Sequence, residues 1–308
     1  MGSPPIAAPT LDLLARDFDV RLVVTQPDRP SGRGLKVTST AVHERAGELG
    51  LPVMTTGDVN SQECIARLKS AEPQGIVVVS FGQLLRKAVL ALPPLGCINV
   101  HFSLLPELRG AAPVAWAVIR GMEETGVSIM KMAPRMDAGA VLAQARERID
   151  PKDTAVTVAA RLAPIGARLL VETLALYAGG RITPAAQDEG GVTFAPKITR
   201  QTAAIDWTRS AREVDCLIRG LSGQMEAYAY YEGPSRLRVA LYMSAVTDAV
   251  TPGPGVAARG PHGELLAGCG SGMIEVMEIQ AQGRRRVLGR EFANGYHVRG
   301  GERFSNGL

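Results

Sequence analysis

The chain contains few cysteines and histidines, and neither type forms a recognisable cluster. Its four cysteines are scattered over 308 residues without a Cys-x-x-Cys pair. Such spacing suits a reducing compartment better than a disulfide-bonded scaffold or a zinc site. The four histidines also lack metal-ligand spacing. We therefore expect a cytoplasmic protein without a metal centre.

Long hydrophobic runs and targeting signals are absent as well. No run of roughly 18 or more apolar residues occurs, so we expect no membrane-spanning helix. The opening residues, MGSPPIAAPTLDLLARDFDV, lack the basic patch and apolar core of a signal peptide. The spacing Gly-x-Gly-x-x-Gly is missing too, which argues against a dinucleotide-binding dehydrogenase.

The composition that remains is that of a globular protein. Hydrophobic residues make up 46% of the chain and charged residues 21%. A chain of this length can bury one large core or two ordinary ones, so two domains are expected. The formal net charge of +4 permits a polyanionic partner without requiring one.

The first half alternates between strand-like and helix-like stretches. Apolar runs at 21–25, 75–80 and 96–101 are typical of buried strands, and helices are expected at 41–49 and 61–71. This alternation predicts an α/β fold, with a parallel sheet covered by flanking helices. Ligands of such sheets bind beyond the carboxyl ends of the strands.

The second half has a different organisation. Residues 154–178 are predicted to form one long helix, and residues 184–196 are rich in Gly, Pro and polar residues, which is typical of a linker. From about Ala204 onward the chain shows short β-like pieces separated by turn residues, with a helix expected at 209–219 that precedes or caps them. They predict a small antiparallel barrel.

The strongest chemical pattern is Asn99-Val100-His101 at the end of a predicted strand, followed later by Asp137 in a loop. Alternation along a strand places Asn99 and His101 on one face. An amide and a protonated imidazole could donate to the oxyanion of an acyl transfer, and the carboxylate could orient the imidazole or help to remove a proton from an attacking amine. The alternative is structural, because such a histidine is often simply packed and Asp137 could only cap a turn.

Two basic segments are candidates for nucleic-acid contact. The loop 26–36 (QPDRPSGRGLK) carries Arg29, Arg33 and Lys36, and residues 284–286 are three consecutive arginines. Clustered cations of this kind suit phosphates or unpaired bases. Each segment could equally be a solvated surface with incidental charge.

Several specific segments resemble the 10-formyltetrahydrofolate-dependent formyltransferases. Residues 98–132 (INVHFSLLPELRGAAPVAWAVIRGMEETGVSIMKM) and 136–139 (MDAG) are similar to the catalytic region of that family. Residues 23–34 (VVTQPDRPSGRG), 192–207 (VTFAPKITRQTAAIDW) and 275–296 (EVMEIQAQGRRRVLGREFANGY) resemble its methionyl-tRNA formyltransferase branch.

The resemblance implies a fold, a reaction and a set of site residues. It implies a Rossmann-like catalytic domain at 1–184, a linker at 185–203 and an OB-like β-barrel at 204–308 that helps to bind tRNA. It implies transfer of a formyl group from 10-formyltetrahydrofolate to the amino group of initiator methionyl-tRNA, by a cytoplasmic protein expected to be a monomer. The implied catalytic residues are Asn99, His101 and Asp137. The implied folate-binding residues are Phe81, Gly82, Gln83, Leu84, Ser103, Leu104, Leu105 and Pro106. The implied tRNA-binding residues are Arg29, Arg33 and Lys36, with Arg284, Arg285 and Arg286 on the barrel.

Three departures from the family pattern qualify these expectations. The strand that normally opens the fold is missing before Met1-Gly2-Ser3-Pro4, which suggests a start assigned too late or a truncation. Its loss would leave backbone groups unpaired beside the 21–25 strand. The segment 222–227 departs from the family at the entry to the barrel, and Phe102 replaces a small residue, so that its ring could reshape the pocket.

Two other functions stay open at this point. A sugar-nucleotide N-formyltransferase would share the catalytic triad and the folate but use another amine. A truncated relative without catalytic activity would bind folate or RNA without turnover. The segment 26–34 and the barrel-like carboxyl-terminal region favour tRNA over the sugar.

Overall fold

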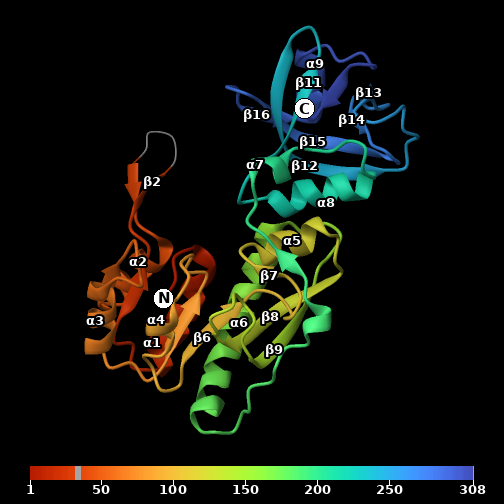
Figure 1. The fold of residues 1–308 in the computed structure, drawn as a ribbon. Helices are drawn as coiled ribbons and strands as arrows, with labels where there is room; N and C mark the ends of the chain where they lie inside the picture. The colour runs from red at the N-terminus through yellow and green to blue at the C-terminus, as the bar shows by residue number, and fades with distance from the viewer. Residues whose placement is uncertain (32–35, 308) are drawn as a thin grey trace. The chain divides into compact units, whose positions relative to one another are not determined.

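The chain folds into two compact units, which we describe separately. The computed structural model describes residues 1–31 and 36–307, with the side chains of 29–37 outside the description. The first unit comprises Met1–Pro113, Glu124–Arg148 and Ala159–Pro196, and the second comprises Val114–Glu123, Ile149–Val158 and Lys197–Leu308 (Figure 1).

The first unit has a two-stranded parallel sheet and a four-stranded sheet that is parallel in one part and antiparallel in the other. The paired strands are β1 (Val23–Thr25) with β4 (Val53–Thr55), and β5 (Ile76–Val79) with β6 (Cys97–His101), both parallel as expected. Then β8 (Glu124–Lys131) and β9 (Val141–Arg148) continue from β6 in antiparallel fashion, which the expectation of a parallel sheet had missed. The connection 132–140 is too short for the crossover that a parallel β8–β9 pair would need.

The helices begin where the sequence places their caps. Thr40 accepts a hydrogen bond from the backbone N–H of His43 at the start of α2 (Ala41–Glu48), and Ser61 does the same for Cys64 in α3 (Gln62–Ser70). The long predicted helix is confirmed as α6 (Ala155–Ala178). The remaining elements of this part of the chain are η1 (Pro5–Ala7), α1 (Ala8–Asp17), β2 (Arg29–Ser31), β3 (Lys36–Thr38), α4 (Lys87–Leu90), β7 (Arg109–Gly110), α5 (Pro113–Ile119), η2 (Glu189–Gly191) and β10 (Phe194–Ala195).

The segment from 185 to 196, which composition indicated as linker, packs on the first unit. Its strand β10 pairs in parallel with β7, with Phe194 opposite Arg109 and Ala195 opposite Gly110. The backbone N–H of Ala112 also donates to the carbonyl of Ala195. This part of the chain is therefore built into the first unit, next to the residues that follow β6.

The second unit carries the expected antiparallel barrel. Its strands run in the order β13-β14-β15-β12-β11-β17, with β16 paired to β15. Their bounds are β11 (Ala227–Glu232), β12 (Arg236–Thr247), β13 (Ala257–Arg259), β14 (Leu265–Gly268), β15 (Met273–Ala281), β16 (Arg286–Leu288) and β17 (Arg303–Ser305). A bridge between Val256 and Arg303 nearly closes the barrel. The helices are α7 (Arg200–Ala203), α8 (Ala211–Leu221) and α9 (Gly289–Gly295).

Only Met1 and Gly2 lie between β1 and β5 in the described part of the chain. The backbone N–H of Gly2 donates to Val24, and the carbonyl of Met1 accepts from Val79. Gly2 thus forms a single parallel bridge to Val79. These contacts join only the carboxyl ends of β1 and β5.

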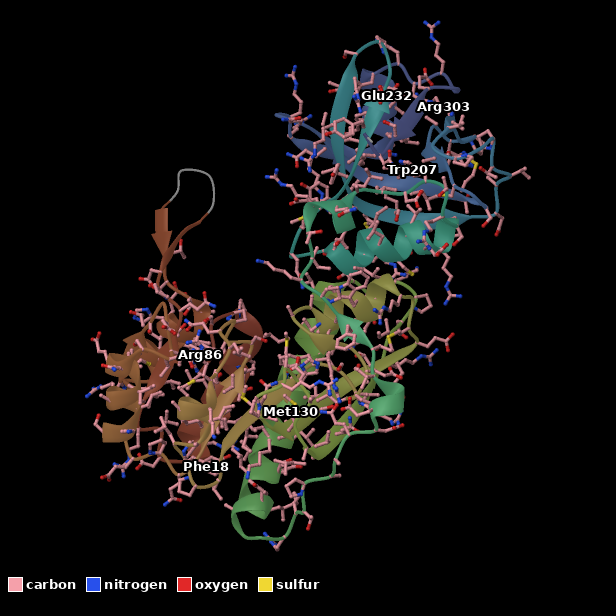
Figure 2. The ribbon with its side chains drawn as sticks, viewed as in Figure 1. Phe18, Arg86, Met130, Trp207, Glu232 and Arg303 are labelled. Carbon is pink, nitrogen blue, oxygen red and sulfur yellow. The ribbon has the colours of Figure 1, made fainter. Side chains whose placement is uncertain are left out.

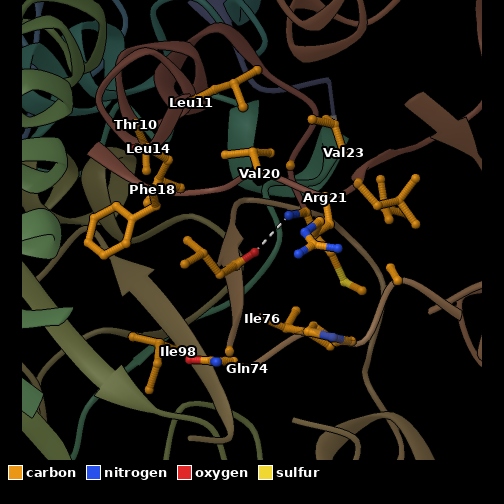
Figure 3. Close-up of a pocket in the computed structure, with 18 of the residues that line it drawn as sticks. Thr10, Leu11, Leu14, Phe18, Val20, Arg21, Val23, Gln74, Ile76 and Ile98 are labelled. Atoms are coloured by element: carbon orange, nitrogen blue, oxygen red, sulfur yellow. Dashed lines mark hydrogen bonds between the residues drawn. The ribbon is translucent and has the colours of Figure 1, made fainter. Parts of the chain in front are cut away.

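A cavity of about 460 Å³ opens between the amino ends of the same two strands (Figure 3). Arg21 and Val23 line it on the β1 side, and Gln74 and Ile76 line it on the β5 side. Leu11 of α1 adds to its mostly apolar wall. The cavity is thus a mostly apolar slot flanked by the edges of β1 and β5.

The amino group of Met1 lies at the inner end of this slot and donates to the carbonyl of Val77 over 2.7 Å. Burial lowers the pKa of this amino group to about 5 from its usual 8.0. Between these two values the unfolded chain binds a proton that the folded chain does not. The free energy of unfolding should therefore rise with pH from about 5 to about 8, and this contribution should be lost as the pH falls.

Adding four β-branched residues before Met1 should raise the melting temperature and abolish this pH dependence. The added strand would bury apolar surface in the slot and replace the titrating amine by a peptide group. Thermal unfolding from pH 5 to pH 8 measures both effects. A Gly-Ser extension of equal length is the control. An equal or larger rise in melting temperature with that control would refute the prediction that the added β-branched residues fill the slot as a strand.

Candidate active site

Asn99 and His101 project from the same face of β6, as their spacing predicted. Both are buried, with 9% and 5% of their surfaces exposed. They lie opposite Met130 and Ser128 of β8. Figure 2 labels Met130 on this part of the sheet. Among the described residues, no side-chain hydrogen bond engages the Asn99 amide, whose donors are available for a ligand.

The imidazole of His101 has a defined orientation. Its Nε2 lies 3.0 Å from the carbonyl oxygen of Leu108, which can only accept, so Nε2 carries a proton. The other ring nitrogen, Nδ1, lies 3.8 Å from Oδ2 of Asp137. A proton gained by His101 would therefore reside on Nδ1, on the side of the carboxylate.

Asp137 occupies a tight loop whose geometry is set by its neighbours. Its φ angle is +48°, in the left-handed region that aspartate tolerates better than most residues. Its Oδ2 accepts a 2.8 Å hydrogen bond from the backbone N–H of Gly110. Gly139 packs so closely that a Cβ there would lie 1.8 Å from the carbonyl oxygen of Lys131. The structure thus brings Asn99, His101 and Asp137 to one place.

A second set of side chains holds the Asp137 loop in place, and the sequence did not predict it. Gln187 donates from Nε2 to the carbonyls of Asp137 and Gly139, over 2.8 and 2.7 Å. The Oε1 of Gln187 accepts two hydrogen bonds from Arg109, which also pairs with Glu189. Arg109 is only 1% exposed, and a buried guanidinium with such partners is a signal that the sequence could not show.

The loop after β5 contains the first group of expected folate residues. Because β5 and β6 are parallel neighbours, this loop lies at the same edge of the sheet as His101. Phe81 is buried in the core, whereas Leu84 is 60% exposed. Gln83 is bonded to the backbone of Val59 and Thr56. At Gly82, with φ +81°, an added Cβ would lie 2.3 Å from Nε2 of Gln26. Gly82 and Leu84 are therefore the members of this group with free surface.

The second group of expected folate residues forms a rigid turn. Ser103 is buried, and its hydroxyl donates to the carbonyl of Glu107. The backbone N–H of Leu105 donates to Ser128, and Leu104 and Pro106 are partly exposed. In this turn, as in the loop after β5, the less buried apolar side chains are the ones that could contact a ligand.

Phe102 does not face this site, contrary to the expectation that its ring could reshape the pocket. It is 4% exposed and lies beside Val100 and Val127 against Gly166 of α6. Alternation along β6 turns it away from His101. The other departure, 222–227, connects α8 to β11.

The expected tRNA residues are described only in part. Arg33 lies outside the described residues, and the side chains of Arg29 and Lys36 lie outside the description. On the barrel, Arg284 and Arg285 are exposed, while Arg286 pairs with Glu278.

Arginines cover three tyrosine rings on the same barrel. The guanidinium carbons of Arg236, Arg238 and Arg286 lie 4.5, 4.4 and 4.1 Å from the nearest ring centroids. The rings are those of Tyr230, Tyr228 and Tyr242. Arg286 of β16 therefore adds to a surface of arginines stacked on tyrosines that β11 and β12 provide.

Among the residues that the structure describes, no group of three or more potential metal ligands gathers. No helix in that part of the chain is long and apolar enough to cross a membrane. All four cysteines are free and buried, and burial raises the pKa of the Cys97 thiol to about 11, so that it stays protonated near neutral pH.

Comparison with known families agrees with this geometry. Residues 10–174 match the formyl transferase family, and residues 197–297 match the formyl transferase carboxyl-terminal domain. The chain belongs to the formyl transferase family. Within this family, the triad-bearing edge of the sheet and the barrel correspond to the two matched domains.

Relatives and a solved structure extend the comparison. A methionyl-tRNA formyltransferase from Geobacter metallireducens is 38% identical over 99% of this chain and 97% of its own length. One from Desulfotalea psychrophila is 42% identical over 97% and 92%. The crystal structure of WlaRD, a sugar 3N-formyl transferase with dTDP and 5-N-formyl-THF, superposes with a TM-score of 0.64 at 14% identity, over 92% of this chain and 97% of that one. At that identity the structure supports the fold alone.

Replacing Gly139 with Ala should lower the catalytic rate of formyl transfer by roughly 10²-fold, because a shift of about 1 Å in a catalytic group has an effect of that size. The new Cβ would collide with the backbone of Lys131 and displace the Asp137 loop. Gly57→Ala is the matched control, since nothing lies within 4 Å of a Cβ there. Steady-state rates and melting temperatures of both variants test this, and equal rates for the two would contradict it.

Proposed function

We propose that this formyl transferase moves the formyl group of 10-formyltetrahydrofolate to the amino group of initiator methionyl-tRNA, producing N-formylmethionyl-tRNA in the cytoplasm. The observation that carries the proposal is the similarity, at 38–42% identity over 97–99% of the chain, to proteins named methionyl-tRNA formyltransferase. The match extends through the barrel, which a shared fold of the catalytic domain alone would not explain. We expect it to act as a monomer.

The triad supports direct transfer without an enzyme nucleophile. The methionyl amine attacks the formyl carbon, and a C–N bond forms while the formyl oxygen gains negative charge. The amide of Asn99 and the protonated Nδ1 of His101 donate to that oxyanion. The bond from the formyl carbon to N10 then breaks, and the proton lost by the amine ends on N10.

Asp137 lies close enough to His101 to take part in the proton transfers of this reaction. Its Oδ2 lies 3.8 Å from Nδ1 of His101, the ring nitrogen on which a proton gained by the imidazole would reside. The hydrogen bond from Gly110 restrains the same oxygen. The carboxylate can therefore stabilise the charge on His101 or accept the proton of the amine.

The co-substrate fits the edge of the sheet beside the triad. The exposed backbone at Gly82 and the exposed side chain of Leu84 suit a flat, partly apolar ring system. The turn of 103–106 bounds the same edge from the β6 side. The solved sugar 3N-formyl transferase of similar fold contains a folate derivative, 5-N-formyl-THF.

Two surfaces are proposed to contact the tRNA. The loop of 26–36 carries Arg33, with Arg29 and Lys36 as helpers, toward the acceptor end that distinguishes the initiator. On the barrel, Arg284, Arg285 and Arg286 would contact phosphates. The guanidinium groups that cover the tyrosine rings of β11 and β12 offer flat planes on which unpaired bases could stack.

A formylation assay tests the reaction and the triad together. Purified protein is supplied with 10-formyltetrahydrofolate and charged initiator tRNA, charged elongator methionyl-tRNA or an amino-sugar nucleotide. Product on the initiator alone is expected, and His101→Ala should lower its rate by roughly 10²–10⁴-fold. Product on the sugar would replace the proposed acceptor, and soluble wild-type protein without product would indicate a relative without catalytic activity.

Replacing Arg33 with Ala should raise the KM for initiator tRNA by roughly tenfold or more, while binding of the folate stays unchanged. The change removes one cation from the proposed tRNA contact. Arg16→Ala, which removes an exposed arginine paired with Asp17 on α1, is the matched control. An equal loss of folate affinity in Arg33→Ala would show that this loop does not act through the RNA.

A further inference from the structure

Gln187 uses its whole hydrogen-bonding capacity between the Asp137 loop and a buried arginine. Its two N–H donors reach the carbonyls of Asp137 and Gly139, and its oxygen accepts from Nε and Nη2 of Arg109 at 3.0 and 2.8 Å. Arginine can only donate, so the oxygen of Gln187 must face Arg109 and its nitrogen must face the loop. No other residue type of this size supplies a double acceptor and a double donor in one plane.

Arg109 is itself held in place, so Gln187 forms a rigid connection between Arg109 and the Asp137 loop. Its side chain is buried and bonded to Glu189 over 2.9 Å, and this hydrogen bond lowers the pKa of the Glu189 carboxyl. The strand pairing of β7 with β10 holds the backbone of Arg109 beside the segment that carries Gln187. Gln187 therefore connects β7 and its own segment, which are both anchored, to a loop that has no regular secondary structure.

The loop requires such support because Asp137 is held in an unusual conformation. Its φ of +48° is stable only where surrounding contacts fix it. Gln187 donates to the carbonyls of Asp137 and Gly139, on either side of Ala138, while the backbone N–H of Gly110 donates to the side chain of Asp137. Together these contacts determine where Oδ2 lies relative to Nδ1 of His101.

We propose that Gln187 is a positioning residue for formyl transfer, which acts by holding Asp137 in its working geometry. This inference rests on the proposed function. It assigns a role in catalysis to a segment that composition indicated as a linker. A purely structural role, in which Gln187 only attaches residues 185–196 to the first unit, makes a different prediction.

The test combines Gln187→Glu with Asp137→Asn. The glutamate keeps an acceptor for Arg109 but places a carboxylate against two carbonyl oxygens, so the clamp on the loop is lost. We expect kcat to fall by roughly 10–100-fold, the range found for residues that orient catalytic ligands, with little change in KM for tRNA. Gln201→Glu, an exposed glutamine of α7, controls for the added charge.

Non-additivity separates positioning from structure. If Gln187 acts through Asp137, then adding Gln187→Glu to Asp137→Asn should lower kcat by less than about twofold further. The full 10–100-fold loss in both backgrounds would overturn the proposal. So would a loss of rate in Gln187→Glu that follows only from a lower folded fraction, measured by thermal unfolding.

A readout without substrate distinguishes this inference from the proposed function. The N–H of Gly110 donates to Asp137, so its hydrogen exchange should accelerate in Gln187→Glu but not in Gln201→Glu. Unchanged exchange would refute the clamp, whichever acceptor the enzyme uses. Faster exchange in a protein that forms no formylmethionyl-tRNA would support the clamp and reject the proposed function.

Discussion

The position of one carboxylate determines whether this site can work. Asp137 lies on a short loop, with a backbone conformation that costs on the order of 1–3 kcal/mol and persists only because its surroundings impose it. The hydrogen bond from Gly110 holds the carboxylate from one side, and Gln187 holds the peptide carbonyls from the other. A strained residue with contacts on both sides is a rigid one, and rigidity is what an electrostatic partner of His101 needs.

The side chains along β6 face the site and the core in alternation. Asn99 and His101 face the site, whereas Ile98, Val100 and Phe102 face the interior, where Phe102 packs against Gly166 of α6. A Cβ at position 166 would lie 3.1 and 3.2 Å from methyl groups of Val100 and Val127, so the glycine mainly leaves space for these two valines. The ring of Phe102 lies among them, and it leaves the site face of β6 unaltered.

How far the sequence could predict the site depends on how local each signal is. Asn99 and His101 could be predicted because strand alternation and the carboxyl-terminal rule operate within a few residues. The same alternation would have placed Phe102 in the core. Gln187 could not be found in this way, because its partners lie 50 and 78 positions away along the chain. Its surroundings of Gly, Pro and polar residues indicate a linker, and only the pairing of β10 with β7 makes them part of the site.

The same distinction explains which parts of the fold were predicted. Buried strands, capped helices and the antiparallel barrel follow from periodicity and turn residues, whereas the direction of β8 and β9 depends on how the chain returns to the sheet. The gap between β1 and β5 adds a constraint of its own. Met1 and Gly2 join these strands at their carboxyl ends, and both residues also line the slot that continues between the amino ends. The loop after β5 and the end of β6 leave the sheet at its carboxyl edge, so the pairing made by Met1 and Gly2 lies at the edge of the sheet that carries the site.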